Sequence, residues 1–382
     1  MLEHSSPEVS AAAQNKRRQT FRLLSLLMAV GVALLVAGLI ESFLRWDESR
    51  IRKSDAMDAT LFRRDPELGW VLSPGASGNH RHHDFSASYT IGPLGFRHDP
   101  AIGQPPKQPF TAVLGDSFTF GLGVADNETF VHHLNNAFDQ KHQFLNCGVP
   151  GYSTDQELLI AEREVIALKP ERILLMVCLA NDLIDNLRPV PMQVNQAKPW
   201  FELSSDVLVL KGVPIESGFA TSALPGDLMV NVFGSDYVTG SMRNRLDWRF
   251  ILFRKFASVV WPHPDLRPGL AAATLNSQTL FWALVERLRE KATRIGSRLE
   301  ICLLPGKTMV KAPHSPQGSY QVHLRDALLA EAKKRGIRAH HPSMNNHKAA
   351  PTPSESSLFF PNDGHFTPEG HRVVADELRL KL

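Results

Sequence analysis

Residues 110–118 carry the stretch FTAVLGDSF, in which an apolar, β-rich run ends at a glycine, an acid and a serine. A short, continuous apolar run that stops at a tight turn is typical of a buried strand in a parallel sheet. Ser117 would then lie at the carboxyl end of this strand, where open α/β sheets bind their ligands. The stretch predicts both a sheet and a hydroxyl group at its functional edge.

Similar apolar runs recur along the chain and alternate with segments of helical periodicity. The predicted strands are 110–114, 143–147, 172–178, 299–304 and 337–340. The predicted helices include 155–168 and stripes around 281–288 and 324–332. Ser153 and Thr154, with Gln156 and Glu157 three residues on, form a capping-box pattern at the first of these helices. This alternation predicts an α/β domain with a parallel sheet covered on both faces.

Composition places the chain among ordinary globular proteins. It has 382 residues and a formal net charge of +3, with much of the basic excess before residue 23. This pattern predicts no nucleic-acid surface. The cysteines are Cys147, Cys178 and Cys302, and their positions in or beside apolar runs predict buried thiols. No disulfide framework, metal motif or cofactor motif is found, so we expect neither metal nor cofactor.

The segment 23–45 is predicted to be a transmembrane helix. Leu23 to Ile40 contains no charged residue, and with its flanks the segment approaches the ~20 residues that cross hydrocarbon. Basic residues precede it, namely Lys16, Arg17, Arg18 and Arg22. The positive-inside rule therefore predicts a cytoplasmic tail at 1–22, a single pass through the cell inner membrane, and a periplasmic remainder. A cleaved signal peptide is the alternative.

The remainder divides into two predicted parts. Residues 46–108 are rich in turn signals, and Trp70 and Phe96 among glycines predict a small juxtamembrane lobe packed on the main domain. The main domain spans 109–382. Its pattern breaks at about 187–275, which predicts an insertion with a hairpin-like stretch at 201–214 over the carboxyl edge of the sheet.

Near the other end of the chain lies Asp363-Gly364-His365. A serine is a poor nucleophile at neutral pH unless a base takes its proton and a third group orients that base. Ser117, His365 and Asp363 supply these three groups if the two segments converge. The sequence therefore predicts a serine-hydrolase site.

Four blocks in one order carry a family resemblance. They are Gly115-Asp116-Ser117-Phe118, the stretch NCGVPGYST at 146–154, Asn181-Asp182 and Asp363-Gly364-His365. This order resembles the SGNH/GDSL hydrolase superfamily over most of residues 109–382. The resemblance implies a three-layer, flavodoxin-like fold. It implies that Ser117 is the nucleophile, that His365 is the base with Asp363 as its partner, and that the Ser117 N–H, Gly151 and Asn181 form the oxyanion hole.

The wider pattern resembles membrane-anchored members linked to extracellular polysaccharide. Shared features are the anchor, Gly69-Trp70, Gly95-Phe96-Arg97, GDSFTFG at 115–121 and Glu128-Thr129-Phe130. The resemblance implies an esterase whose substrate is an acylated carbohydrate or another small ester, with O-acetyl the expected acyl group. Two alternatives stay open: an O-acyltransferase acting on a polysaccharide, and a non-catalytic glycan-binding or assembly protein, which Leu179 would permit in place of a usual glycine. Oligomeric state is left open.

Several further motifs are assigned no chemistry. Many family members space acid and base as Asp-x-x-His, which would put Asn362 in the acid position. The Asp363-x-His365 spacing instead resembles that of periplasmic sugar O-acetyltransferase-like members. The stretch PGKT at 305–308 lacks the first glycine of a P-loop, and His80 to Asp84 is predicted to be a solvated turn. We expect structural roles for Asp116, Asp182 and His371.

Overall fold

The structure is a computed structural model that describes residues 7–138, 141–192, 194, 196–215, 249–260, 270–272, 274–344 and 357–382. These residues form two compact units. One unit holds the described residues up to Arg52 together with 249–260, and the other holds the described residues from Lys53 onward apart from 249–260.

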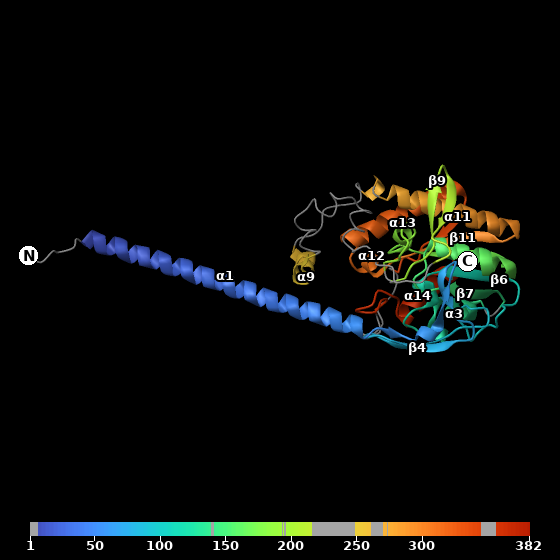
Figure 1. Cartoon of the computed structure of the whole chain (residues 1–382), viewed down its shortest axis with the longest axis horizontal. Helices are drawn as coiled ribbons and strands as arrows, with labels where there is room; N and C mark the ends of the chain where they lie inside the picture. Colours follow the sequence, from blue (N-terminus) through green and yellow to red (C-terminus); the bar gives the residue numbers. More distant parts are fainter. Residues whose placement is uncertain are drawn as a thin grey trace, which may run out of the picture. The chain divides into compact units, whose positions relative to one another are not determined.

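A five-stranded parallel sheet lies at the centre of the larger unit (Figure 1). Its strands are β6 (Phe110–Gly115), β7 (Gln143–Gly148), β8 (Arg172–Cys178), β11 (Arg298–Leu304) and β12 (Arg338–His340). All five match the predicted strands to within one residue at each end. The order β12-β11-β8-β6-β7 is that of flavodoxin-like folds, so the predicted fold class is confirmed. In such a sheet the ligand site lies where the strand order reverses, between β6 and β8.

Helices cover both faces of the sheet. One face packs α3 (Phe130–Ala137) and α14 (Pro368–Arg379), and the other packs α4 (Thr154–Ile160), α11 (Leu275–Arg294) and α13 (Pro316–Arg335). Because successive side chains of a strand point to opposite faces, Val113 joins the first layer and Leu114 joins the second. This alternation explains why every residue of β6, β7 and β8 is buried.

Short helical turns complete the larger unit. They are η1 (Ala59–Leu61), α2 (Ser117–Phe120), η2 (Asp126–Glu128), η3 (Ala161–Val165), η4 (Ile166–Leu168), α5 (Asp182–Asp185) and α12 (Lys307–Lys311). The predicted helix 155–168 is therefore α4 continued by η3 and η4. Its predicted capping box is wrong. The Ser153 hydroxyl donates to Asp155, and the Gln156 side chain donates to the Leu68 carbonyl. The Thr154 hydroxyl and the Glu157 carboxyl have no hydrogen-bond partner among the described residues.

Two small antiparallel sheets precede the main sheet in sequence. The strands β1 (Ala56–Met57), β4 (Ser77–Arg81) and β5 (Ser86–Thr90) form one, and β2 (Phe62–Asp65) and β3 (Gly69–Leu72) form the other. Residues 56–108 are called the lobe from here on. Its Trp70, Tyr89 and Phe96 belong to the same hydrophobic core as Leu114 of the main sheet.

The region 187–275 contains the hairpin that the sequence predicts at 201–214, formed by β9 (Trp200–Ser204) and β10 (Val207–Lys211). The parts of this region at 216–248 and 261–269 lie outside the described residues. Its helix α9 (Ile251–Val260) belongs to the smaller unit, where the Glu41 carboxylate accepts hydrogen bonds from the backbone N–H groups of Ile251 and Leu252 at 3.1 and 2.8 Å.

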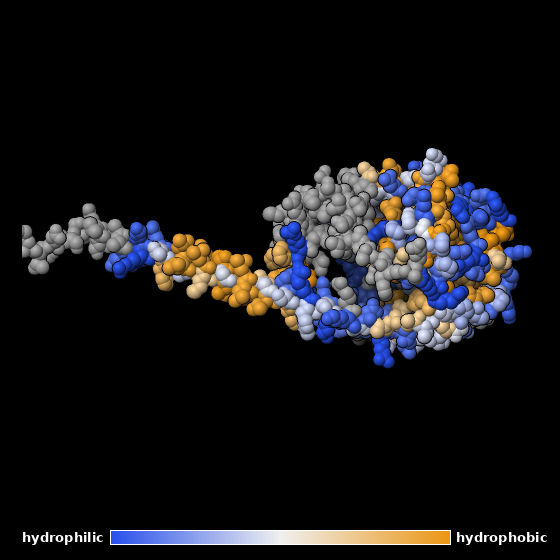
Figure 2. All heavy atoms as spheres, in the orientation of Figure 1, coloured by the Kyte–Doolittle hydropathy of each residue, from blue (hydrophilic) through white to orange (hydrophobic). Residues whose placement is uncertain are grey.

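The helix α1 runs from Pro7 to Lys53 and contains the predicted span 23–45. Its segment Gln14–Ile51 is long and apolar enough to cross a membrane. Figure 2 shows hydrophobic residues along the middle of this helix, with hydrophilic residues on the N-terminal side of them. The three cysteine thiols, as predicted, are free and buried in the larger unit.

Candidate active site

Ser117 lies where β6 ends, as the first residue of α2. The preceding Asp116 caps this helix, and its carboxylate accepts a hydrogen bond from the Phe118 N–H at 2.9 Å. A Cβ atom at Gly115 would overlap the Thr119 side chain, so only glycine lets the chain turn this tightly from strand to helix. The turn places the Ser117 hydroxyl at the carboxyl edge of the sheet, and the residue keeps 5% of its surface exposed.

His365 and Asp363 reach the same place from the C-terminal loop between Phe359 and Phe366. The His365 Nε2 atom lies 2.7 Å from the Ser117 Oγ, although the residues are 248 positions apart. On the other side of the ring, Nδ1 lies 2.6 Å from an Asp363 carboxylate oxygen. The Phe118 ring lies 4.8 Å from the His365 ring, centroid to centroid, and restrains it. The structure thus brings together Ser117, His365 and Asp363.

The charge of Asp363 determines which way these hydrogen bonds point. Burial alone would raise the pKa of Asp363, but the hydrogen bond to the His365 side chain, the charge of that ring and the His365 backbone N–H outweigh it and hold the pKa at about 2. An ionised carboxylate only accepts, so the Nδ1 atom carries the proton. The Nε2 atom is then free to accept a hydrogen bond from the Ser117 hydroxyl.

Gly151 follows β7 and borders the same edge of the sheet. Its φ of +82° is strained for any residue with a side chain, and a Cβ atom there would contact Val194 and Trp70. Within the described part of the chain, neither the Gly151 N–H nor the Ser117 N–H donates a hydrogen bond to a protein acceptor. Both groups are therefore available to an incoming oxygen atom.

Asn181 follows β8 and directly precedes α5, although its side chain makes no capping hydrogen bond to that helix. Its side-chain amide donates to the carboxylates of Asp182 and Asp185, at 3.2 and 3.4 Å. Both bonds are long, so they hold the amide weakly. Asn181 can contact a substrate oxygen only by exchanging one of them.

A group of buried acids lies behind Ser117 and Asn181. Burial raises the pKa of Asp116, of Glu157 and of Asp182, and repulsion between the three raises it further for the last two. The Asp182 carboxylate accepts from the Cys178 N–H at 2.6 Å, and Asp116 accepts from Phe118. These two acids have the predicted structural roles, and the group holds protons that isolated carboxyls would lose.

Two motifs that sequence reasoning set aside hold the loop of His365. The carboxylate of Asp84 accepts hydrogen bonds from the Asn362 and Asp363 N–H groups at 2.6 and 2.8 Å and from the Asn362 side chain at 2.7 Å. The Lys307 ammonium donates to the carbonyls of Phe360 and Pro361 at 2.7 and 2.6 Å. These contacts join distant segments, so no local sequence signal could have indicated them.

The predicted solvated turn at His80 to Asp84 is right for Arg81 and His83, which are exposed, but wrong for His80 and Asp84. His80 is buried, and its ring nitrogens lie 3.0 Å from the Tyr89 hydroxyl and 2.6 Å from an Asp55 carboxylate oxygen. Asp84 is half-buried against the C-terminal loop. Among the described residues, no group of three or more histidine, cysteine or acidic side chains is arranged to hold a metal ion.

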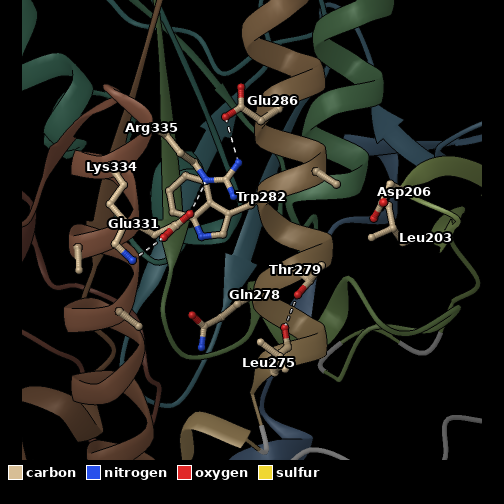
Figure 3. A pocket seen from close by; sticks show the side chains of 13 residues that line it. Leu203, Asp206, Leu275, Gln278, Thr279, Trp282, Glu286, Glu331, Lys334 and Arg335 are labelled. Carbon is tan, nitrogen blue, oxygen red and sulfur yellow. Dashed lines mark hydrogen bonds and ion pairs between the residues drawn. The ribbon is translucent and has the colours of Figure 1, made fainter.

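His371 and a separate cavity lie outside this site. Burial lowers the pKa of His371 to about 3, and its Nδ1 accepts a hydrogen bond from the Phe130 N–H, which is the structural role predicted for it. The cavity, of about 580 Å³, lies on α11, α13 and the β9–β10 hairpin. In Figure 3 it is lined by Trp282 and by the ion pair of Glu286 with Arg335. It shares no residue with the Ser117 site.

The fold and the sequence family together define a serine hydrolase that acts on esters. Residues 113–373 match the model of the GDSL-like Lipase/Acylhydrolase family, which is more than half of the chain. The chain belongs to this family, and the resemblance seen in the sequence is confirmed. No curated protein matches the chain.

Several solved structures are similar. A putative lipolytic protein of the G-D-S-L family from Desulfitobacterium hafniense is 13% identical with a TM-score of 0.37, over 72% of this chain and 100% of that one. The esterase EstA from Pseudoalteromonas sp. is 10% identical with a TM-score of 0.35, over 71% and 94%. An acetyl xylan esterase, AlAXEase, is 11% identical with a TM-score of 0.36, over 72% and 99%.

Proposed function

We propose that this chain is a membrane-anchored esterase that removes small O-acyl groups, chiefly acetyl, from a carbohydrate. The observation that carries the proposal is the continuous line of hydrogen bonds from the Ser117 hydroxyl through His365 to Asp363, at 2.7 and 2.6 Å. This arrangement supports a catalytic triad, in which each group activates the next.

The reaction follows from the protonation states. The Ser117 oxygen attacks the ester carbonyl carbon while His365 Nε2 takes the serine proton. The tetrahedral intermediate then expels the sugar hydroxyl, which receives that proton, and an acyl-serine remains. Water gives a proton to His365 and attacks the acyl-serine, and the carboxylic acid leaves as Ser117 regains its proton. Asp363 stays ionised and stabilises the imidazolium in both halves.

The negative oxygen of each intermediate needs preorganised donors. The backbone N–H groups of Ser117 and Gly151 support this role because no described acceptor occupies them. The third proposed donor is the Asn181 amide, released from one of its long bonds to Asp182 or Asp185. Each such donor contributes about 3–4 kcal/mol in other hydrolases.

The choice of substrate depends on the sequence resemblance. The sequence resemblance favours acetyl as the acyl group. The sequence features shared with polysaccharide-associated members favour a carbohydrate as the alcohol. The segment Gln14–Ile51 supports the anchor, and the basic residues before it support a cytoplasmic N-terminus with a periplasmic site in the inner membrane.

The direct test compares the purified full-length chain in detergent with its Ser117→Ala variant. Hydrolysis of p-nitrophenyl acetate and of glucose pentaacetate should be lost in the variant, and p-nitrophenyl octanoate should be a poorer substrate than the acetate. Equal acetate hydrolysis by both proteins would defeat the proposal. Acetyl transfer to an added oligosaccharide, without free acetate, would make the enzyme a transferase that uses the same acyl-serine.

The anchor is tested separately from the chemistry. Protease added to intact spheroplasts should digest the region after α1 and leave a fragment of the N-terminal tail and span in the membrane. A mature protein that lacks residues 1–45 and is released as a soluble form would show that the segment is a cleaved signal peptide.

A further inference from the structure

The lobe contacts three of the four segments that carry the proposed active site, those of Ser117, of Gly151 and of His365. The Arg97 guanidinium, which is fully buried, donates to the carbonyls of Phe120, Gly121 and Val124, at and just after the end of the Ser117 helix, at 2.9, 3.1 and 2.9 Å. The Trp70 indole donates to the Pro150 carbonyl, next to Gly151, at 2.9 Å. Asp84 binds the loop of Asp363 and His365.

The contact made by Asp84 is the one nearest to the acid and the base. Asp84 lies in the turn between β4 and β5, and one of its oxygens accepts from the N–H groups of both Asn362 and Asp363. Its other oxygen accepts from the Asn362 amide. Burial alone would raise the pKa of Asp84, but these three hydrogen bonds outweigh it and lower the pKa, so the group is ionised at neutral pH. Charge-assisted bonds of this kind are stronger than neutral ones.

These bonds fix the backbone from which the Asp363 side chain projects. The Asp363 carboxylate must face His365 Nδ1 at 2.6 Å, and the direction of its N–H sets the direction of its Cα–Cβ bond. The Phe85 ring, next to Asp84, packs on the Phe360 ring at 4.9 Å between centroids. Lys307 holds the same loop through the Phe360 and Pro361 carbonyls.

We propose that Asp84 is a positioning residue of the esterase, which orients Asp363 and through it His365. The proposal rests on the proposed function, because it assigns these two residues their roles. Asp84 itself touches neither Ser117 nor the substrate. The lobe then contributes to catalysis by holding the acid and the base in position.

The test measures kcat and KM for p-nitrophenyl acetate with the full-length Asp84→Ala and Asp84→Asn variants. A misplaced general base costs turnover, so we expect kcat to fall by about 10- to 100-fold in Asp84→Ala with KM little changed. Asp84→Asn keeps an oxygen acceptor and should recover part of this loss. Asp58→Asn is the matched control, since Asp58 also belongs to the lobe and accepts a backbone hydrogen bond, from Asn79 at 2.7 Å.

Hydrogen exchange separates the possible outcomes. In Asp84→Ala the amides of Asn362 and Asp363 should exchange faster, at an unchanged unfolding midpoint. Wild-type kcat in Asp84→Ala, or an equal loss of kcat in Asp58→Asn, would overturn the positioning role while Ser117→Ala still tests the esterase. If the wild-type chain is no more active than Ser117→Ala, the proposed function fails and the role of Asp84 fails with it.

Discussion

The carboxyl edge of the sheet and the lobe contribute to one site in different ways. In our proposal the edge supplies Ser117 at the end of β6 and the oxyanion donors Gly151 and Asn181 after β7 and β8. The C-terminal loop brings His365 and Asp363 to the same edge. The lobe supplies no reactive group in our proposal, but Arg97 and Trp70 bind the segments that follow β6 and β7, and Asp84 binds the loop that carries the base. Chemistry and positioning are thus assigned to different parts of the chain, and substitutions in the two regions should have different effects.

The largest expected effect is a loss of turnover on substitution of a proposed catalytic residue at the carboxyl edge of the sheet. In Asp363→Asn the new amide would donate to His365 Nδ1, the proton would move to Nε2, and that nitrogen could no longer accept from Ser117. We expect kcat to fall by about 10⁴-fold, as in serine proteases with this change. The control is Asp376→Asn, on the exposed side of α14. Normal turnover by Asp363→Asn would remove Asp363 from the triad.

A substitution of Arg97 in the lobe should have an intermediate effect, which concerns the free energy of unfolding and not turnover. The Arg97 guanidinium makes four hydrogen bonds, to three carbonyls and to Asp126, and it packs against the Tyr89 and Phe120 rings, 4.5 Å from each centroid. Arg97→Lys keeps the charge but cannot reach all four acceptors, so we expect a loss of roughly 2 kcal/mol in the free energy of unfolding.

Thermal unfolding of the full-length chain measures this loss, with the exposed Arg63→Lys as control. A variant with an unchanged midpoint would show that the lobe does not depend on Arg97. If Arg97→Lys keeps its unfolding midpoint but loses turnover, Arg97 positions the active-site segments and does not mainly stabilise the fold.

The smallest expected effect concerns the buried acids behind the site. The folded state raises the pKa of Glu157 well above 4.5, so above that pH the folded chain keeps a proton that the unfolded chain releases. The free energy of unfolding therefore falls as pH rises from about 4.5. In Glu157→Gln this group cannot titrate, so the thermal unfolding midpoint should decline less steeply between pH 5 and 8. Part of the decline should persist, because the pKa of Asp182 is raised as well. Exposed Glu164→Gln is the control, and parallel declines in all three proteins would contradict the account.

The candidate residues Ser117, His365 and Asp363 were predictable from the sequence, but the contacts that the lobe makes with their loops were not. Ser117 and His365 could be assigned because an apolar strand that ends in Gly-Asp-Ser and a short Asp-x-His loop are local patterns. Trp70 and Arg97 stand in recognisable motifs, but these motifs do not reveal what they bind. The Asp84 carboxylate accepts a hydrogen bond from the Asp363 N–H, 279 positions away. A contact between such distant residues produces no periodicity, spacing or composition signal in the sequence.

The capping box failed for a related reason. Its pattern at Thr154 and Glu157 predicts a local hydrogen bond, in which the acid accepts from the backbone at the helix start. In the folded chain Glu157 is buried beside Asp116 and Asp182 behind the sheet edge, where tertiary packing outweighs the local preference.

The most direct test of the central claim is to label the full-length chain with a fluorophosphonate and map the adduct by mass spectrometry. We expect one adduct, on Ser117, that is absent in Ser117→Ala and forms about 100-fold more slowly in His365→Ala, which lacks the base. An adduct on another residue, or labelling of Ser117 at the same rate without His365, would contradict it.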